Sequence, residues 1–402
     1  MLKKFAAVFF LFVSSFIARG QAAPDSCSLE VSLLTCAPGT DLYSIFGHTA
    51  IRIQDKRRDM DIIYNYGMFN DTDPMFYLNF TKGIMRYSLG AETFDSFMVE
   101  YQMEQRPVVS QMLNLNCAEK KRIYEALRSN TLEENRFYDY RFHTDNCTTR
   151  AGKMIEGITD KPLLYNNILP TPGPSFRDMI HEYLDPQDQK WAKFGIDLLL
   201  GKNLDIKPTN VEAIHFLPDY LFRGMDSASA GDKKLVGEKT LLLQFDVTKT
   251  TASFFTPLLL TQIILLLCIT LYVLRPRLKL AKALRIFDIV FFTVLGLFGL
   301  LIATVWLIRV DTVCRDNMNI LWATPTHLVA VMFLRKKPVW LKYYFLVAGL
   351  ISLILLAGFP WWMQRMNIAV VPLLAIIIFR SVDIFYRLHS DQNLRHAQTA
   401  VV

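Results

Sequence analysis

The chain has 402 residues, of which 52% are hydrophobic, and a formal net charge of +7. The positive surplus lies mostly in short links between long apolar runs in the last third of the chain, and the region before them has no basic stripe. This distribution indicates membrane orientation and excludes the footprint of a nucleic-acid-binding protein.

The first 22 residues are predicted to be a signal peptide. Lys3 and Lys4 precede an apolar stretch at 5–18, and small residues follow at Gly20 and Ala22. Retention as an uncleaved anchor is the alternative, although the apolar stretch is too short to span a bilayer comfortably. We therefore expect an exported domain to begin at residue 23.

The exported region, 23–250, has a mixed α+β pattern. Strand character is predicted at 30–36, from His48 onward, at 61–67 and from 87. Helices are predicted at 117–130 and from 147 to about 156, where Asn146 is a good capping residue. A proline-rich loop is predicted at 160–175, followed by helical and loop-like residues at 176–225.

Five apolar runs follow, at 254–274, 286–308, 318–334, 343–360 and 367–385. Each is near the length that crosses a hydrocarbon core of about 30 Å, although the third is marginal. Arginine and lysine are concentrated in the links after the first and third runs and in the tail, which are therefore predicted to be cytoplasmic. We expect residues 251–402 to form an α-helical five-span membrane domain with the exported domain on the opposite side from the tail.

Two short motifs in the exported domain carry chemistry. Gly47-His48 begins a predicted strand, and Asn146-Cys147 begins a predicted helix. A thiol at a helix N-terminus beside an imidazole is a typical cysteine nucleophile, because the helix end and the imidazolium both favour the thiolate. Asn65 is the candidate that orients His48, since its strand is predicted to lie beside the His48 strand.

Several interpretations remain open from the residues alone. Asn146, Asp145 and His143 are candidates for supporting roles, because they lie close to Cys147 in sequence. The same motifs also fit a structural histidine and a cap followed by a buried thiol. An oxidising compartment would permit one disulfide, with the candidate cysteines being Cys27, Cys36 and Cys117. No spacing typical of a metal site and no phosphate-binding loop is present, so neither metal nor cofactor is predicted.

The chain resembles the Bacteroides-type lipoprotein N-acyltransferases, a family with a periplasmic domain followed by five membrane helices. The resemblance covers nearly the whole mature chain. It rests on the motifs at 34–39 (LTCAPG), 46–52 (FGHTAIR), 65–67 (NYG), 145–150 (DNCTTR), 191–201 (WAKFGIDLLLG) and 216–218 (FLP). The order of histidine before cysteine also resembles the circularly permuted papain-like (NlpC/P60-like) superfamily, to which lecithin:retinol acyltransferase is similar.

The resemblance implies a permuted papain-like periplasmic domain on a bacterial inner membrane. It implies that Cys147 accepts an acyl chain from a membrane phospholipid as a thioester, with His48 as the base. The acceptor would be the α-amine of the diacylglyceryl-cysteine of a diacylated lipoprotein. The role of Asn65 stays open, because the third residue varies across that superfamily.

Two other functions remain as alternatives. One is a membrane-tethered NlpC/P60-like cysteine peptidase or amidase acting on peptidoglycan, and the other is a scaffold with a structural cysteine. Polar residues in the third apolar run, including Asn319 and His327, predict either a pocket on the membrane side of the site or helix packing around a kink at Pro325.

Overall fold

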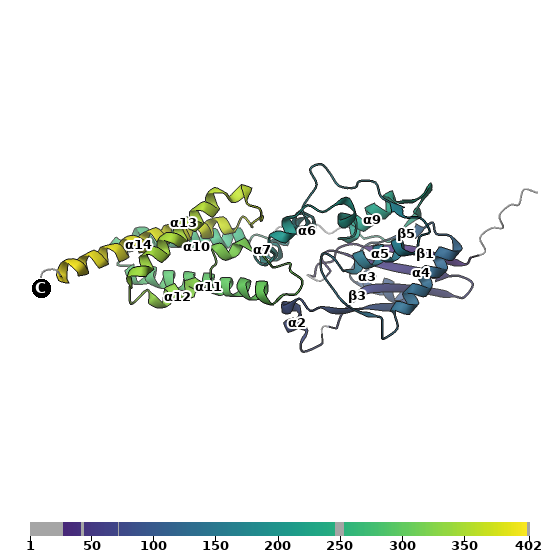
Figure 1. Ribbon diagram of the computed structural model, residues 1–402, viewed down its shortest axis with the longest axis horizontal. Helices are drawn as coiled ribbons and strands as arrows, with labels where there is room; N and C mark the ends of the chain where they lie inside the picture. Colours follow the sequence, from purple (N-terminus) through teal and green to yellow (C-terminus); the bar gives the residue numbers. More distant parts are fainter. Residues whose placement is uncertain (1–26, 42–43, 71, 246–252, 400–402) are drawn as a thin grey trace, which may run out of the picture.

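The computed structural model describes residues 27–41, 44–70, 72–245 and 253–399. The predicted signal peptide and the expected domain boundary near residue 250 lie outside these described residues. A sheet-rich domain lies at one end of the molecule and a group of long helices at the other, with the C-terminus at the end distant from the sheet (Figure 1). The expected order, an α+β domain followed by a helical region, is therefore confirmed.

A seven-stranded antiparallel sheet forms the centre of the first domain, with strand order β10-β5-β1-β2-β3-β4-β6. Its strands are β1 (Leu29–Cys36), β2 (His48–Asp55), β3 (Met60–Met68), β4 (Arg86–Thr93), β5 (Val108–Leu113), β6 (Phe137–Asp139) and β10 (Val236–Leu243). The four predicted strands are β1 to β4, and β2 pairs with β3 as expected. The edge strand β10 was not predicted, because most of its side chains are exposed and its pattern does not alternate clearly.

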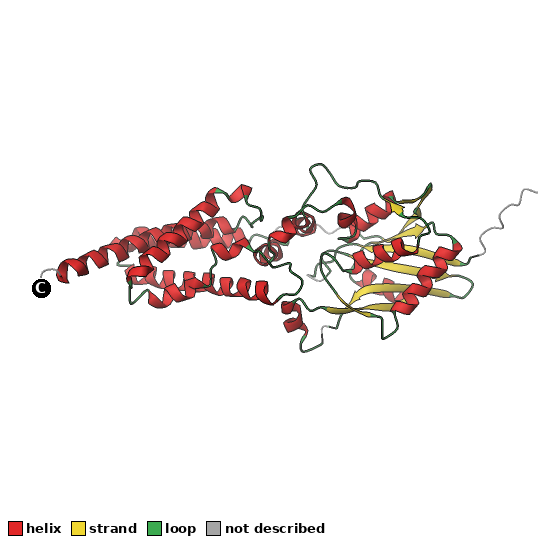
Figure 2. Cartoon of the chain, viewed as in Figure 1, coloured by secondary structure: helices red, strands yellow, loops and turns green. Residues whose placement is uncertain are grey.

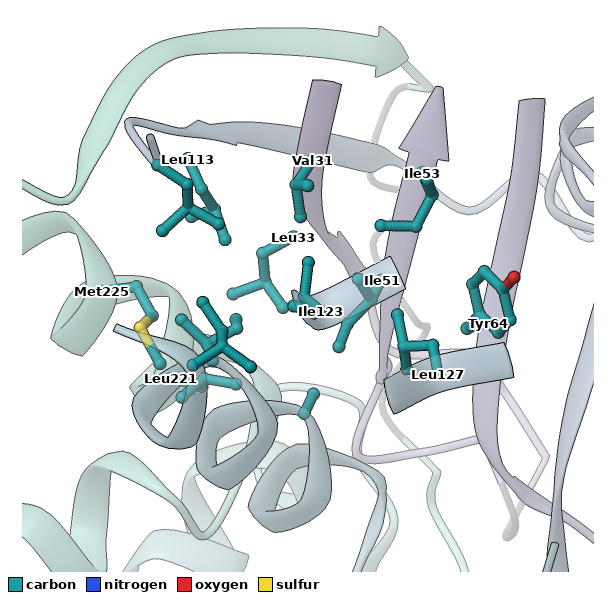
Figure 3. Packing of buried hydrophobic residues seen from close by; sticks show 14 of the residues in the cluster. Val31, Leu33, Ile51, Ile53, Tyr64, Leu113, Ile123, Leu127, Leu221 and Met225 are labelled. Carbon is teal, nitrogen blue, oxygen red and sulfur yellow. The ribbon is translucent and has the colours of Figure 1, made fainter. Parts of the chain in front are cut away.

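Helices cover both faces of this sheet (Figure 2). They include α3 (Phe94–Met103), α4 (Cys117–Asn130) and α5 (Cys147–Ile158). Ile123 of α4 packs with Leu33 and Ile51 in one core (Figure 3). The same core contains Ile155 of α5, and each fully buried side chain of this kind contributes about 1.5–3 kcal/mol. On the other face of the sheet, Phe97 of α3 packs in a second cluster that contains Leu34 and Ala50. These residues are the sequence neighbours of Leu33 and Ile51, and successive side chains of a strand point to opposite faces. The first of these cores holds α5 beside β2.

Helical residues and a small sheet follow α5. They comprise α6 (Phe176–Leu184), α7 (Lys190–Leu199), the 3-10 helix η1 (Lys202–Asp205), α8 (Asn210–Ile214), α9 (Pro218–Ser227) and strands β7 (Leu163–Leu164), β8 (Ser229–Ala230) and β9 (Lys233–Lys234). The short helix α2 (Phe76–Lys82), between β3 and β4, was not predicted from the sequence.

The C-terminal region contains α10 (Pro257–Leu278), α11 (Ala281–Ile308), α12 (Thr326–Phe333), α13 (Val339–Ala357) and α14 (Val370–Thr399). Among the described residues, α10, α11 and α13 are long and apolar enough to cross a membrane. The third apolar run is not one continuous helix. It divides into a 3-10 turn at Met318–Leu321 and α12, because Pro325 stands at the start of α12 and interrupts the helix. The eight residues of α12 rise only about 12 Å. The five-span arrangement therefore remains a prediction.

A polar joint connects the two parts of the molecule. The amide nitrogen of Asn317 donates to the carbonyl oxygens of Leu198 (2.8 Å) and Leu199 (3.0 Å) at the end of α7. At Gly201 two segments of the backbone approach so closely that a Cβ atom would lie 1.7 Å from the carbonyl oxygen of Arg315. The motif at 191–201 is thus the segment that fixes the sheet domain against the helical region.

A buried ion cluster stabilises the same joint from the side of the sheet domain. Arg177 of α6 is fully buried and pairs with Asp197 (3.1 Å) and Asp205 (2.9 Å). The second carboxylate oxygen of Asp197 accepts a hydrogen bond from Asn367, which precedes α14. The buried charges of this cluster compensate one another, so the loss of any member leaves a buried charge without its partner and destabilises the joint.

Candidate active site

His48 is the first residue of β2, and Asn65 lies on the neighbouring strand β3. The imidazole Nε2 of His48 is 3.0 Å from the amide oxygen of Asn65. The amide nitrogen of Asn65 donates to a carboxylate oxygen of Glu92 on β4 at 2.7 Å. Because Glu92 can only accept, it directs the amide nitrogen of Asn65 toward itself and the amide oxygen toward His48. The proton on His48 is thereby held at Nε2, which leaves Nδ1 to receive a proton from a thiol.

Cys147 is the first residue of α5, and Asn146 is its N-cap. The amide oxygen of Asn146 accepts hydrogen bonds from the backbone N–H (2.8 Å) and hydroxyl (3.1 Å) of Thr149. Its amide nitrogen donates to the carbonyl oxygens of Phe142 (2.7 Å) and Phe216 (2.9 Å). Asn146 therefore links the start of α5 to the carbonyl groups of Phe142 and Phe216. The contact at Phe216 gives the FLP motif a structural role.

The thiol of Cys147 lies near the imidazole of His48, and each group shifts the pKa of the other. Burial opposes ionisation of the thiol, but the charge and hydrogen bond of His48, the backbone N–H of Thr49 and the hydroxyl of Thr148 outweigh it and lower the pKa of Cys147. Burial likewise opposes a charge on His48, but Cys147 and Asn65 outweigh it and raise the pKa of that imidazole. The two directions agree and favour a thiolate–imidazolium pair.

Two glycines near this site have left-handed backbone conformations. Gly47 has a φ of +76°, and a Cβ atom there would lie 2.5 Å from the carbonyl oxygen of Cys36. Gly67 has a φ of +97° and lies beside Cys147, whose Cβ atom would be 3.7 Å from a Cβ at Gly67. Both conformations favour glycine, which accounts for its place in the FGH and NYG motifs.

Such an arrangement can perform nucleophilic acyl chemistry. A thiolate at a helix N-terminus can attack an acyl carbon, and an imidazolium held by an amide oxygen can protonate the leaving group. The backbone N–H groups at the start of α5 are donors suited to the developing oxyanion.

Comparison with known proteins identifies two family models that match the chain. A family model described as the Lnb N-terminal periplasmic domain matches residues 18–185. A second, described as the Lnb transmembrane domain, matches residues 249–391. The chain belongs to the Lnb family. This is the Bacteroides-type lipoprotein N-acyltransferase family, so the resemblance stated from the motifs is confirmed. No curated protein and no solved structure matches the chain.

Membership of the Lnb family establishes a membrane protein of lipoprotein processing with a periplasmic N-terminal domain. The structure brings three of the predicted residues, His48, Asn65 and Cys147, together at one point of this domain. Glu92 was missed, because an isolated acidic residue on a strand gives no signal until the strand pairing places it beside Asn65. Thr49 and Thr148 were missed as well, although both lie directly next to the predicted pair.

The predicted supporting residues near Cys147 have structural contacts in this Lnb-family chain. Asp145 forms two hydrogen bonds of 2.7 Å with Arg150, whose guanidinium lies 3.6 Å from the ring centroid of Tyr138. His143 packs edge-on against Phe176, and burial lowers its pKa. In the described part of the chain, neither side chain forms a hydrogen bond with the sulfur of Cys147.

The two residues predicted for a membrane-side pocket lie in packed contacts instead. The amide nitrogen of Asn319 donates to the carbonyl oxygens of Asp197 (3.0 Å) and Leu198 (3.2 Å), and its oxygen accepts from the indole of Trp322 (3.0 Å). His327 donates to the carbonyl of Trp322 and accepts from the hydroxyl of Tyr344 at 2.7 Å. Both residues therefore support the joint and the helix packing, the second interpretation made from the sequence.

The candidate cysteines for a disulfide occupy different surroundings. Cys27 and Cys117 line one cavity of about 330 Å³ at the start of α4. Cys36 is fully buried opposite His48 in the pairing of β1 with β2, and burial raises its pKa to about 12.

Proposed function

We propose that the protein is a lipoprotein N-acyltransferase with Cys147 as the nucleophile, His48 as the general acid and base, and Asn65 as the orienting residue. The observation that carries the proposal is that these three side chains lie together at the start of α5, in a domain that contacts the helical region through the joint at Gly201. The order of histidine on β2 and cysteine on α5 supports a permuted papain-like domain.

The first half-reaction forms an acyl-enzyme. The Cys147 thiolate attacks the ester carbonyl of a membrane phospholipid, a carbon–sulfur bond forms, and the ester carbon–oxygen bond breaks. The leaving lysophospholipid alkoxide takes the proton of the His48 imidazolium. His48 is then neutral and ready to act as a base.

The second half-reaction forms the amide. The α-amine of the diacylglyceryl-cysteine attacks the thioester, His48 accepts a proton from the nitrogen, and the Cys147 thiolate leaves. The thiolate–imidazolium pair is thereby restored. Amide formation from a thioester is downhill, so the covalent intermediate divides one difficult transfer into two easier steps.

Attachment to the membrane helps this reaction because both substrates are lipids of one leaflet. Lifting an acyl chain into water costs about 0.8 kcal/mol per methylene. A site held at the membrane surface by the joint at Gly201 avoids most of that cost. We also propose that all five C-terminal apolar segments are membrane-embedded and that the C-terminus is cytoplasmic, which agrees with the basic links.

The test uses the full chain in phospholipid nanodiscs. Intact-mass spectrometry is expected to detect an acyl adduct that hydroxylamine removes, and addition of a diacylated lipopeptide should transfer the acyl group to its amine. Cys147→Ala should abolish the adduct, whereas the control Cys27→Ser should retain it. Absence of an adduct in the unaltered protein, or its persistence in Cys147→Ala, would reject the proposal. Cleavage of muropeptides by the same preparation would instead favour the peptidase or amidase.

A further inference from the structure

Helix α2 and the residues that flank it carry an unusual group of exposed apolar side chains. The group is Met68, Phe69, Met75, Leu78, Phe80 and Ile84, which are 39–49% exposed, and we name it the α2 patch. Exposed apolar residues gathered in this way mark interaction surfaces rather than ordinary solvent-facing surface. The patch lies between β3, which carries Asn65, and β4, which carries Glu92.

The position of the patch is fixed by the end of a membrane-spanning helix. The backbone N–H of Val310, two residues after α11 ends, donates to the carbonyl oxygen of Lys82 at 3.0 Å. The guanidinium of Arg309 donates to the carbonyl oxygen of Phe80 at 2.9 Å and lies 5.8 Å from its ring centroid. Figure 1 shows α2 beside this end of α11. The patch therefore lies at the level where α11 leaves the membrane.

The apolar surface continues onto the end of α11 and the residues that follow it. Leu307 is 82% exposed and Val310 is 55% exposed, and Arg309 between them pairs with Asp311. A charged pair beside an exposed apolar surface is the arrangement expected where a protein meets the headgroup layer of a bilayer.

A series of aromatic rings leads from the patch toward the nucleophile. Successive ring centroids are 6.4 Å apart from Phe80 to Phe76, 5.6 Å from Phe76 to Phe69, 5.2 Å from Phe69 to Tyr87 and 4.5 Å from Tyr87 to Tyr140. Tyr140 and Cys147 pack against the same hydrophobic core. Burial is the main cause that raises the pKa of the Tyr140 phenol, and the nearby charge of the Cys147 thiolate is the second.

We propose that the α2 patch inserts into the outer leaflet and that the ring series guides the acyl chain of a membrane phospholipid to Cys147. The bilayer is favoured over a protein partner because the patch is continuous with the exposed apolar surface of α11. The assignment of the phospholipid as the acyl donor rests on the proposed function, whereas insertion of the α2 patch into lipid does not.

The first experiment tests contact with lipid. The photo-crosslinking residue benzoylphenylalanine is placed at Leu78 of the full chain in nanodiscs, with Leu132 as the matched site. Leu132 is similarly exposed, at 49%, but follows α4 on the sheet domain. Lipid adducts are expected to be at least about tenfold more abundant at Leu78. Equal yields at the two sites, or capture of the lipopeptide in place of phospholipid at Leu78, would overturn the proposal.

The second experiment tests delivery of the chain. The double variant Leu78→Ser, Phe80→Ser is compared with Leu132→Ser, using bilayer phospholipid and a soluble butyryl ester as alternative donors. Acyl-enzyme formation from phospholipid is expected to slow on the order of tenfold in the double variant, because polar side chains weaken insertion. The rate with the soluble ester and the rate of alkylation by iodoacetamide should stay within about twofold.

The outcomes separate the two proposals. Equal slowing with both donors, or no slowing with either, would show that the α2 patch has no role in delivery. If the unaltered protein forms no acyl-enzyme from either donor while Leu78 still captures lipid, the proposed function fails and insertion of the patch stands.

Discussion

Removal of the amide that holds His48 is the perturbation whose effect the structure defines best. In Asn65→Ala the 3.0 Å contact with Nε2 is lost, and the partly buried imidazole has one partner fewer for its charged form. A hydrogen bond to a charged group contributes about 1.5–3 kcal/mol. At about 1.4 kcal/mol for each factor of ten, acyl-enzyme formation should slow roughly 10- to 150-fold.

The assay separates this effect from general damage. The rate of acyl-enzyme formation is measured by mass spectrometry in nanodiscs across a range of pH, beside the rate of thiol alkylation. Because Asn65 helps to raise the pKa of His48, its removal should move the alkaline limit of the acyl-transfer profile to lower pH.

The matched control changes the residue behind the amide. Glu92→Gln keeps an oxygen that can accept from Asn65, so its rate should fall only about threefold, whereas Glu92→Ala lets the amide rotate and should approach Asn65→Ala. An Asn65→Ala enzyme that reacts within twofold of the unaltered protein, with an unchanged pH profile, would refute the proposed orienting role.

Three further outcomes are expected. His48→Ala should move the pH midpoint of Cys147 alkylation upward, because burial then raises the pKa of the thiol with less opposition; an unchanged midpoint would contradict the thiolate–imidazolium pair. Gly201→Ala should lower stability by about 1–3 kcal/mol in thermal unfolding, since its Cβ atom would meet a carbonyl oxygen across the joint. Arg177→Met should cost about 3–5 kcal/mol, because two carboxylates would lose their buried partner, and a melting temperature equal to that of the unaltered protein would show the cluster to be dispensable.

The sequence predicted those parts of the site that local chemistry defines. Helix 117–130 has the bounds of α4, and its capping box between Asn116 and Glu119 is a local signal. The start of α5 at Cys147 follows in the same way from the cap at Asn146. Asn65 was chosen because adjacent strands with a short turn usually pair, and β2 and β3 do so.

The parts that were missed depend on distant pairing. Glu92 reaches Asn65 only because β4 lies beside β3, and no residue near Glu92 signals that contact. Polar residues in an apolar run led us to consider a pocket at Asn319, yet its partners are backbone carbonyls of α7, more than a hundred residues earlier. Helix α2 was overlooked because seven residues are too few to show a helical period.

The joint at Gly201 has a consequence for how such proteins can be recombined. At Gly201 two backbone segments touch, the side-chain amides of Asn317 and Asn319 donate to carbonyl oxygens of α7, and Asn367 donates to the side chain of Asp197. A chimera that took its sheet domain from one relative and its helices from another would therefore have to inherit α7 and this turn from the same parent. The unit of exchange is the pair of facing segments, and a crossover placed in the linker between β10 and α10 would divide it.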